Sequence, residues 1–156
     1  MYSRQKAIEY AYKWWNGRNP EYFNFDNYGG DCTNFISQCL YYGGIGMNYS
    51  HNGWYYTSPS SRSPSWTGVD EFFNFVTSNT SIYGVRGKIV SLDEILPGDI
   101  IQFNITGTDF HHSVIVTAVE GKTINDIYVT GHTTDCKNIS IKSFNYKKIR
   151  FIKILN

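Results

Sequence analysis

Residues 28–40 read YGGDCTNFISQCL and place Cys32 directly after a Gly-Gly pair and at the start of an amphipathic run. Apolar side chains recur there at helical spacing, which predicts a helix that begins at Cys32 and ends near residues 42–44. At a helix N-terminus the backbone N–H groups are unpaired and the helix dipole is positive. We therefore expect the pKa of this thiol to fall below about 8.5, as in a reactive cysteine. The alternative is a small buried cysteine without chemistry.

Two other segments have the apolar spacing of helices. One covers residues 4–15, with Ser3 as its cap, and the other covers residues 68–78. A long polar and aromatic loop precedes the second of these helices and extends to about Thr67. Loops of this length inside a domain are usually functional. We predict that this loop forms a wall of a substrate cleft, the alternative being a loop that only packs over the end of the cysteine helix.

The second half of the chain consists of β-branched and aromatic runs separated by turn residues. The predicted strands are residues 89–90, 100–103, 113–119, 124–130 and 149–155. Their order favours an antiparallel sheet whose strands follow one another in sequence. Helices first and strands afterwards indicate an α+β fold in which the cysteine helix packs on the sheet. With 156 residues, the chain is predicted to be one domain, 1–156.

Composition excludes several classes of protein. The net charge is only +1 and charged residues make up 17% of the chain, so a nucleic-acid partner is not expected. Three cysteines cannot form a disulfide scaffold, and no CxxC or HxxxH pair suggests a metal. No run resembles a signal peptide or a membrane span. The chain as written would remain in the cytoplasm, whereas a domain excised from a longer secreted protein would act outside the cell.

Two histidines are predicted to lie beside Cys32. His112 precedes the strand at 113–119, and His132 follows the strand that ends at Gly131. If the two strands form a hairpin, both histidines lie at the same edge of the sheet. One histidine would accept the thiol proton and His132 would fix its tautomer, with Asp135 as a competing orienting group. Backbone N–H groups at the start of the cysteine helix would bind the oxyanion. Two half-buried histidines with structural roles are the alternative.

His111 and His112 are neighbours, and adjacent strand residues face opposite sides, so only one of them can face Cys32. The choice depends on a family resemblance. The motifs that carry it are residues 7–15, GDCTNFISQ at 30–38, SWTGV at 65–69, LPGDII at 96–101, HSVIV at 112–116 and GHT at 131–133. In these motifs the chain resembles the amidase domain family of bacterial cell-wall and secreted proteins, papain-like cysteine hydrolases related to the NlpC-type and CHAP-type peptidoglycan hydrolases.

The resemblance implies a papain-like fold with Cys32 as nucleophile, His112 as base and His132 as third member. It also implies hydrolysis of an amide bond in peptidoglycan or a related peptide, without a cofactor or metal. Asp31, Trp54 and Trp66 are predicted to contact the substrate. We expect a monomer whose partner is that substrate.

Two other functions fit the same sequence. The chain could be a catalytically idle module that binds glycans or peptides through the loop between Trp54 and Trp66. Alternatively, the same three residues could transfer the acyl group to an amine or deamidate a protein. An unreactive Cys32 would favour the binding module, and the products would identify a transferase or deamidase.

Overall fold

The computed structural model describes all residues from 1 to 156 and contains four α-helices. The helices are α1 (Arg4–Trp14), α2 (Cys32–Tyr42), the short α3 (Pro64–Thr67) and α4 (Val69–Ser78). The side chain of Ser3 accepts a hydrogen bond from the backbone N–H of Lys6, as expected for the cap of α1. The helix that begins at Cys32 is confirmed. Asp31 occupies its cap position but makes no capping hydrogen bond, because its carboxylate is bonded elsewhere.

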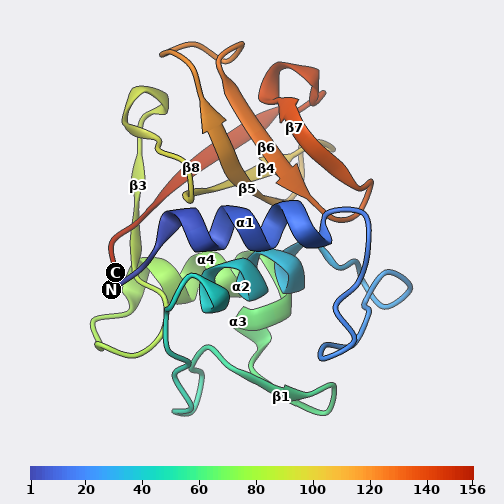
Figure 1. Cartoon of the computed structure of the whole chain (residues 1–156), viewed down its shortest axis with the longest axis vertical. Coiled ribbons are helices and arrows are strands. Elements are labelled where there is room, and N and C mark those ends of the chain that lie inside the picture. Colours follow the sequence, from blue (N-terminus) through green and yellow to red (C-terminus); the bar gives the residue numbers. More distant parts are fainter.

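Six strands form one antiparallel sheet. They are β3 (Gly87–Val90), β4 (Ile100–Asn104), β5 (His112–Val119), β6 (Ile127–Gly131), β7 (Cys136–Ser140) and β8 (Lys148–Ile154). Two 3₁₀ turns, η1 (Leu92–Glu94) and η2 (Ile141–Ser143), connect them. The order across the sheet is β3-β8-β4-β5-β6-β7. The α+β class and the β5–β6 hairpin are confirmed, but the expected sequential order is wrong for β8, which lies between β3 and β4 (Figure 1).

Three further details differ from the expectation. A small hairpin of β1 (Tyr56–Ser58) and β2 (Ser61–Arg62) lies within the loop that was predicted to be irregular. The strand expected to start at 124 starts at Ile127, because residues 123–126 form a turn closed by the carboxylate of Asp126. The edge strand β7 has no period-two pattern, since its three central side chains, Lys137, Asn138 and Ile139, are all exposed.

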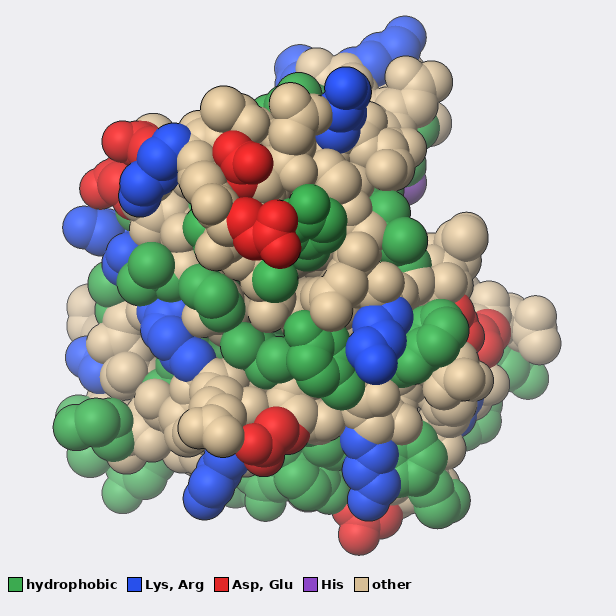
Figure 2. Space-filling view, turned by 45° about the horizontal axis from the view of Figure 1, so that its top comes forward, with side chains coloured by type: hydrophobic (Ala, Val, Ile, Leu, Met, Phe, Trp, Pro, Cys, Tyr) green, Lys and Arg blue, Asp and Glu red, His purple; other side chains and the backbone are tan.

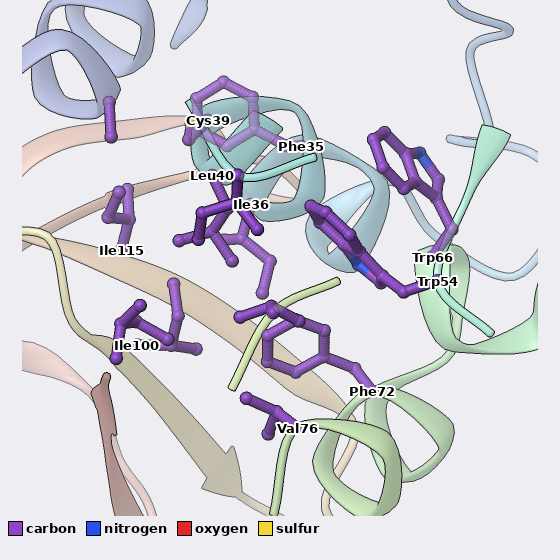
Figure 3. Close-up of a cluster of buried hydrophobic side chains, with 14 of the residues drawn as sticks. Phe35, Ile36, Cys39, Leu40, Trp54, Trp66, Phe72, Val76, Ile100 and Ile115 are labelled. Atoms are coloured by element: carbon purple, nitrogen blue, oxygen red, sulfur yellow. The ribbon is translucent and has the colours of Figure 1, made fainter. Parts of the chain in front are cut away.

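The helices cover one face of the sheet. Figure 1 shows α1 across the middle of the molecule with α2 below it, and both helices contact β5 and β6. The main hydrophobic cluster lies between these layers and includes Phe35 and Leu40 of α2 and Ile100 and Ile115 of the sheet (Figure 3). A smaller cluster occupies the opposite face and contains Phe103. Strand residues alternate between the clusters, so neighbouring residues of β5 face different environments.

Charged side chains of both signs are interspersed over the face shown in Figure 2, which agrees with the low net charge. None of the helices combines the length and the apolar composition needed to cross a membrane. No group of three or more His, Cys, Asp and Glu side chains is arranged to bind a metal ion.

Candidate active site

Cys32 is the first residue of α2 and lies at the start of β5. The next residue, Thr33, ties the start of this helix to β5, because its Oγ1 lies 3.1 Å from Oγ of Ser113. The hydroxyl of Thr33 lies 3.8 Å from the sulfur. The side chain is buried, with 5% of its surface exposed, but its nearest partners are polar. Folding therefore brings residues 32 and 112–113 together across 80 positions of sequence.

The thiol does not have the lowered pKa that was expected. Burial raises the pKa of Cys32 above its ordinary value, although the N–H of Ser113 and the hydroxyl and N–H of Thr33 act in the opposite direction. The expectation is wrong because burial destabilises the charged thiolate by more than the helix N-terminus stabilises it. At neutral pH the sulfur therefore carries its proton and needs a base to ionise.

His112 provides an imidazole that can act as this base. The ring lies 6.1 Å from the ring of Phe103 and 6.0 Å from that of Phe144, between ring centroids, and makes no hydrogen bond within the protein. Burial lowers the pKa of His112 to about 4, with a smaller contribution from the charge of His111. At neutral pH the ring is uncharged and able to accept a proton. No hydrogen bond joins it to Cys32 in this structure.

A cleft of about 610 Å³ opens in front of His112. Its walls come from the start of β5, from residues 133–136 after β6 and from residues 143–145 before β8. Ile105, Ile139 and Phe144 supply apolar surface. Asp135 is the one carboxylate in the lining, and both of its oxygens accept hydrogen bonds from Arg18, at 3.1 and 2.9 Å. The cleft thus presents mainly uncharged surface beside the imidazole.

His132 lies at the expected edge of the sheet but faces away from His112. Its ring stacks on Phe35 of α2 at 3.9 Å. Nδ1 lies 2.6 Å from Oδ2 of Asp31, and Nε2 lies 2.7 Å from the backbone oxygen of Trp14. The hairpin pairs Ile115 with Thr130, a register that, when continued, sets His132 opposite Ser113 rather than His112. The two imidazoles therefore occupy opposite faces of the sheet, and His132 does not orient His112.

Asp135 and His111 were the other candidates for the orienting group and the base. Asp135 bonds to Arg18 and to neither histidine, so it does not orient a ring. His111 is exposed, and its Nδ1 lies 3.0 Å from the backbone oxygen of Asp109. Of the two neighbouring histidines, His112 is the buried one, and its ring lines the cleft.

The residues expected to contact the substrate are in the interior. Trp54 and Trp66 have no exposed surface and pack on each other within the main hydrophobic cluster, with ring centroids 4.8 Å apart and a tilt of 37° between the rings (Figure 3). Their Nε1 atoms donate hydrogen bonds to Oγ of Ser37 and Oδ1 of Asn34, respectively. Asp31 is 1% exposed and bonds to His132. These three side chains offer no surface to a ligand, because each is needed to pack or to anchor α2.

The turn after β6 forms part of the cleft, and no sequence pattern predicted it. Thr133 and Thr134 have backbone φ angles of 60° and 57°, in the left-handed region that β-branched residues rarely adopt. Oγ1 of Thr133 accepts a hydrogen bond from the backbone N–H of Asp31 at 3.1 Å. This turn ties the loop after β6 to the residue before Cys32. Threonine is a poor turn former, so only the structure reveals the turn.

Comparison with known proteins places the chain in a family. Residues 1–155 match the family described as "Putative amidase domain". The chain belongs to this family. It is also 40% identical over 123 residues to the uncharacterized protein YhbB of Bacillus subtilis (strain 168), a match that covers 76% of this chain and 38% of YhbB. The chain thus spans well under half of this relative. No solved structure matches the chain. Membership in the amidase family indicates hydrolysis of amides as its general activity.

Proposed function

We propose that this amidase-family chain is a cysteine-dependent hydrolase of peptide amide bonds, with Cys32 as nucleophile and His112 as base. The observation that carries the proposal is the contact between the start of α2 and the start of β5: Oγ1 of Thr33 lies 3.8 Å from the Cys32 sulfur and 3.1 Å from Oγ of Ser113, the residue after His112. His112 lines the cleft and has no internal hydrogen-bond partner, so its ring is available to a substrate. The chemistry rests on two residues, and His132 serves as an anchor for Asp31 rather than as a third catalytic group.

The reaction begins from a neutral thiol and a neutral imidazole. His112 accepts the proton of Cys32 as the sulfur attacks the amide carbon. The backbone N–H of Cys32 makes no hydrogen bond in the structure and is a suitable donor to the resulting oxyanion. His112 then gives its proton to the leaving amine, leaving a thioester on Cys32. Water hydrolyses the thioester and restores the thiol.

The cleft and the family guide the choice of substrate. Apolar and uncharged groups dominate the lining, and its only carboxylate is neutralised by Arg18. We propose an uncharged acyl group for this cleft. The resemblance of the chain's motifs to the amidase domains of bacterial cell-wall proteins makes cell-wall peptides the first substrates to test. A helix that presents cysteine at its N-terminus against an antiparallel sheet also supports a papain-like relationship.

The experiment compares wild-type protein with Cys32→Ala and His112→Ala on digested sacculi, with released fragments identified by mass spectrometry. Both variants should lose release of amines and peptides, and Cys136→Ser, which changes the one cysteine in the lining of the cleft, should retain it. Full release by Cys32→Ala would refute the proposal. The fragments also name the bond, and an aminated or deamidated product would indicate a transferase or deamidase.

The binding-module alternative lacks its proposed surface. Trp54 and Trp66, which would stack on glycans or peptides, have no exposed surface. The raised pKa of Cys32 is the one feature that agrees with this alternative, which predicts an unreactive thiol. A stable complex between wall fragments and the Cys32→Ala variant, with no cleavage by the wild type, would favour it.

A further inference from the structure

A row of buried polar side chains leads across the sheet to the sulfur of Cys32. Nε of Arg150 donates a hydrogen bond to Oε1 of Gln102 at 2.7 Å. Nε2 of Gln102 donates to Oγ of Ser113 at 3.0 Å, and this oxygen lies 3.1 Å from Oγ1 of Thr33. Oγ1 of Thr33 is 3.8 Å from Sγ of Cys32. Each contact is within hydrogen-bond reach, so the row is continuous.

The strand register aligns this row. Gln102 of β4 is paired with Ser113 of β5 on one side and with Arg150 of β8 on the other. Thr33, the second residue of α2, lies above Ser113. Gln102, Ser113 and Thr33 have no exposed surface. Buried polar groups cost free energy unless each is hydrogen-bonded, so a row of three on a core face indicates a specific arrangement.

The outer end of the row is held rigidly. The guanidinium of Arg150 lies between the rings of Phe73, at 3.7 Å, and Phe110, at 4.0 Å. Its Nη2 also donates to Oδ1 of Asp70 at 3.0 Å. Stacking on two rings together with a charged hydrogen bond fixes the direction of Nε.

The hydrogen bonds of the row have one direction. Arginine only donates, so Oε1 of Gln102 accepts and the amide nitrogen must donate to the backbone oxygen of Val69 and to Ser113. The hydroxyl of Ser113 then donates its hydrogen to Oγ1 of Thr33. The hydroxyl hydrogen of Thr33 is left to be donated to the sulfur of Cys32. The opposite direction would leave the hydroxyl hydrogen of Ser113 buried and unpaired, which is unfavourable.

We infer that Thr33 is a catalytic residue whose hydroxyl donates a hydrogen bond to the sulfur of Cys32, and that Ser113 and Gln102 are positioning residues that hold this hydroxyl. The inference rests on the proposed role of Cys32 as nucleophile. When His112 removes the thiol proton, negative charge develops on a sulfur that burial keeps from water. The Thr33 hydroxyl and the Ser113 N–H are donors that face this charge before the reaction begins.

The test measures how fast iodoacetamide alkylates Cys32 at different pH values, with each cysteine followed separately by mass spectrometry. Thr33→Val replaces the hydroxyl with a methyl group of similar size. Its midpoint should rise by about one pH unit, so alkylation below the midpoint should be about tenfold slower. Thr33→Ser keeps the donor and should titrate close to the wild type. Thr117→Val, which removes another buried hydroxyl of β5, is the matched control and should leave the midpoint unchanged.

Ser113→Ala tests the positioning role, because its side chain does not contact the sulfur. The midpoint should rise by less than in Thr33→Val, since the Thr33 hydroxyl is then free to turn. The double variant should match Thr33→Val alone, as expected for links of one chain. If Thr33→Val does not fold, the shift in Ser113→Ala decides the question. A wild-type midpoint in either foldable variant, or additive shifts in the double variant, would overturn the inference.

Alkylation needs no substrate, so the inference and the proposed function can fail separately. The expected shifts without any amide hydrolysis would refute the proposed function and leave the hydrogen-bond row in place. Unshifted midpoints in variants that still hydrolyse amides would refute only the role of Thr33.

Discussion

Nδ1 of His132 lies 2.6 Å from Oδ2 of Asp31, and both side chains are 1% exposed. This contact joins the end of β6 to the residue that precedes Cys32. Nε2 of the same ring bonds to the last residue of α1 at 2.7 Å. His132 therefore fastens two helices and the sheet at one point, and the position of the thiol depends on it.

Replacing Asp31 with Asn or His132 with Ala should lower the free energy of unfolding by about 1–3 kcal/mol, the typical cost of leaving a buried polar group without its hydrogen-bond partner. Urea denaturation at pH 7 measures this change. Asp135→Asn is the control, because its pairing with Arg18 is 31% exposed and should contribute less than about 1 kcal/mol. Equal losses in the buried and the exposed variants would contradict the anchoring role.

The neutral His112 ring makes stability depend on pH in a defined window. Burial lowers its pKa to about 4 in the folded protein, from 6.5 for an unperturbed ring. Between these values the unfolded chain binds the proton more tightly, so stability should fall as pH decreases from about 6.5 to about 4. The full loss would be about 3 kcal/mol. His112→Gln should lack this component, which the difference between the two unfolding curves from pH 7 to 4.5 measures.

Phe144 helps to keep the His112 ring out of water. The centroids of the two rings are 6.0 Å apart, and Phe144 also stacks on Phe103 at 4.5 Å. Phe144→Ala should admit water and raise the pKa of His112 from about 4 toward 6.5. Titration of the histidine ring protons by NMR measures this shift. Tyr146→Ala is the control, because Tyr146 packs on Phe103 at 5.5 Å but makes no ring contact with His112. A similar shift in both variants would argue against a specific role of Phe144.

Local patterns were sufficient to predict much of the fold. The helix that begins at Cys32 and the β5–β6 hairpin follow from periodicity and turn residues, as does the α+β class. The position of β8 between β3 and β4 could not be predicted in this way, because strand order depends on long-range pairing that periodicity does not encode. The sequence did not predict β7, because its side chains do not alternate between a buried and an exposed face.

The site was predicted in part. Sequence brought the start of the cysteine helix to the start of β5, where Thr33 contacts Ser113, but it also placed His132 beside His112. A hairpin brings two strand ends to the same edge, yet the register decides which face each side chain takes, and a shift of one residue reverses it. Burial was the second missing quantity. It raised the pKa of Cys32 against the helix N-terminus and put Trp54 and Trp66 in the core instead of the cleft.

The turn at Thr133 and Thr134 stores strain beside the cleft. Thr134 has a φ of 57° and makes no hydrogen bond through its side chain, whereas Oγ1 of Thr133 accepts from Asp31. Left-handed backbone costs an ordinary residue about 1–2 kcal/mol, part of which glycine regains. Thr134→Gly should therefore stabilise the fold by about 1 kcal/mol in urea denaturation. Thr80→Gly, at an exposed position whose φ is not positive, should instead destabilise it slightly. Thr133→Gly should gain less than Thr134→Gly, because it also loses the bond to Asp31. A loss of stability in Thr134→Gly equal to that in Thr80→Gly would show that the turn is unstrained.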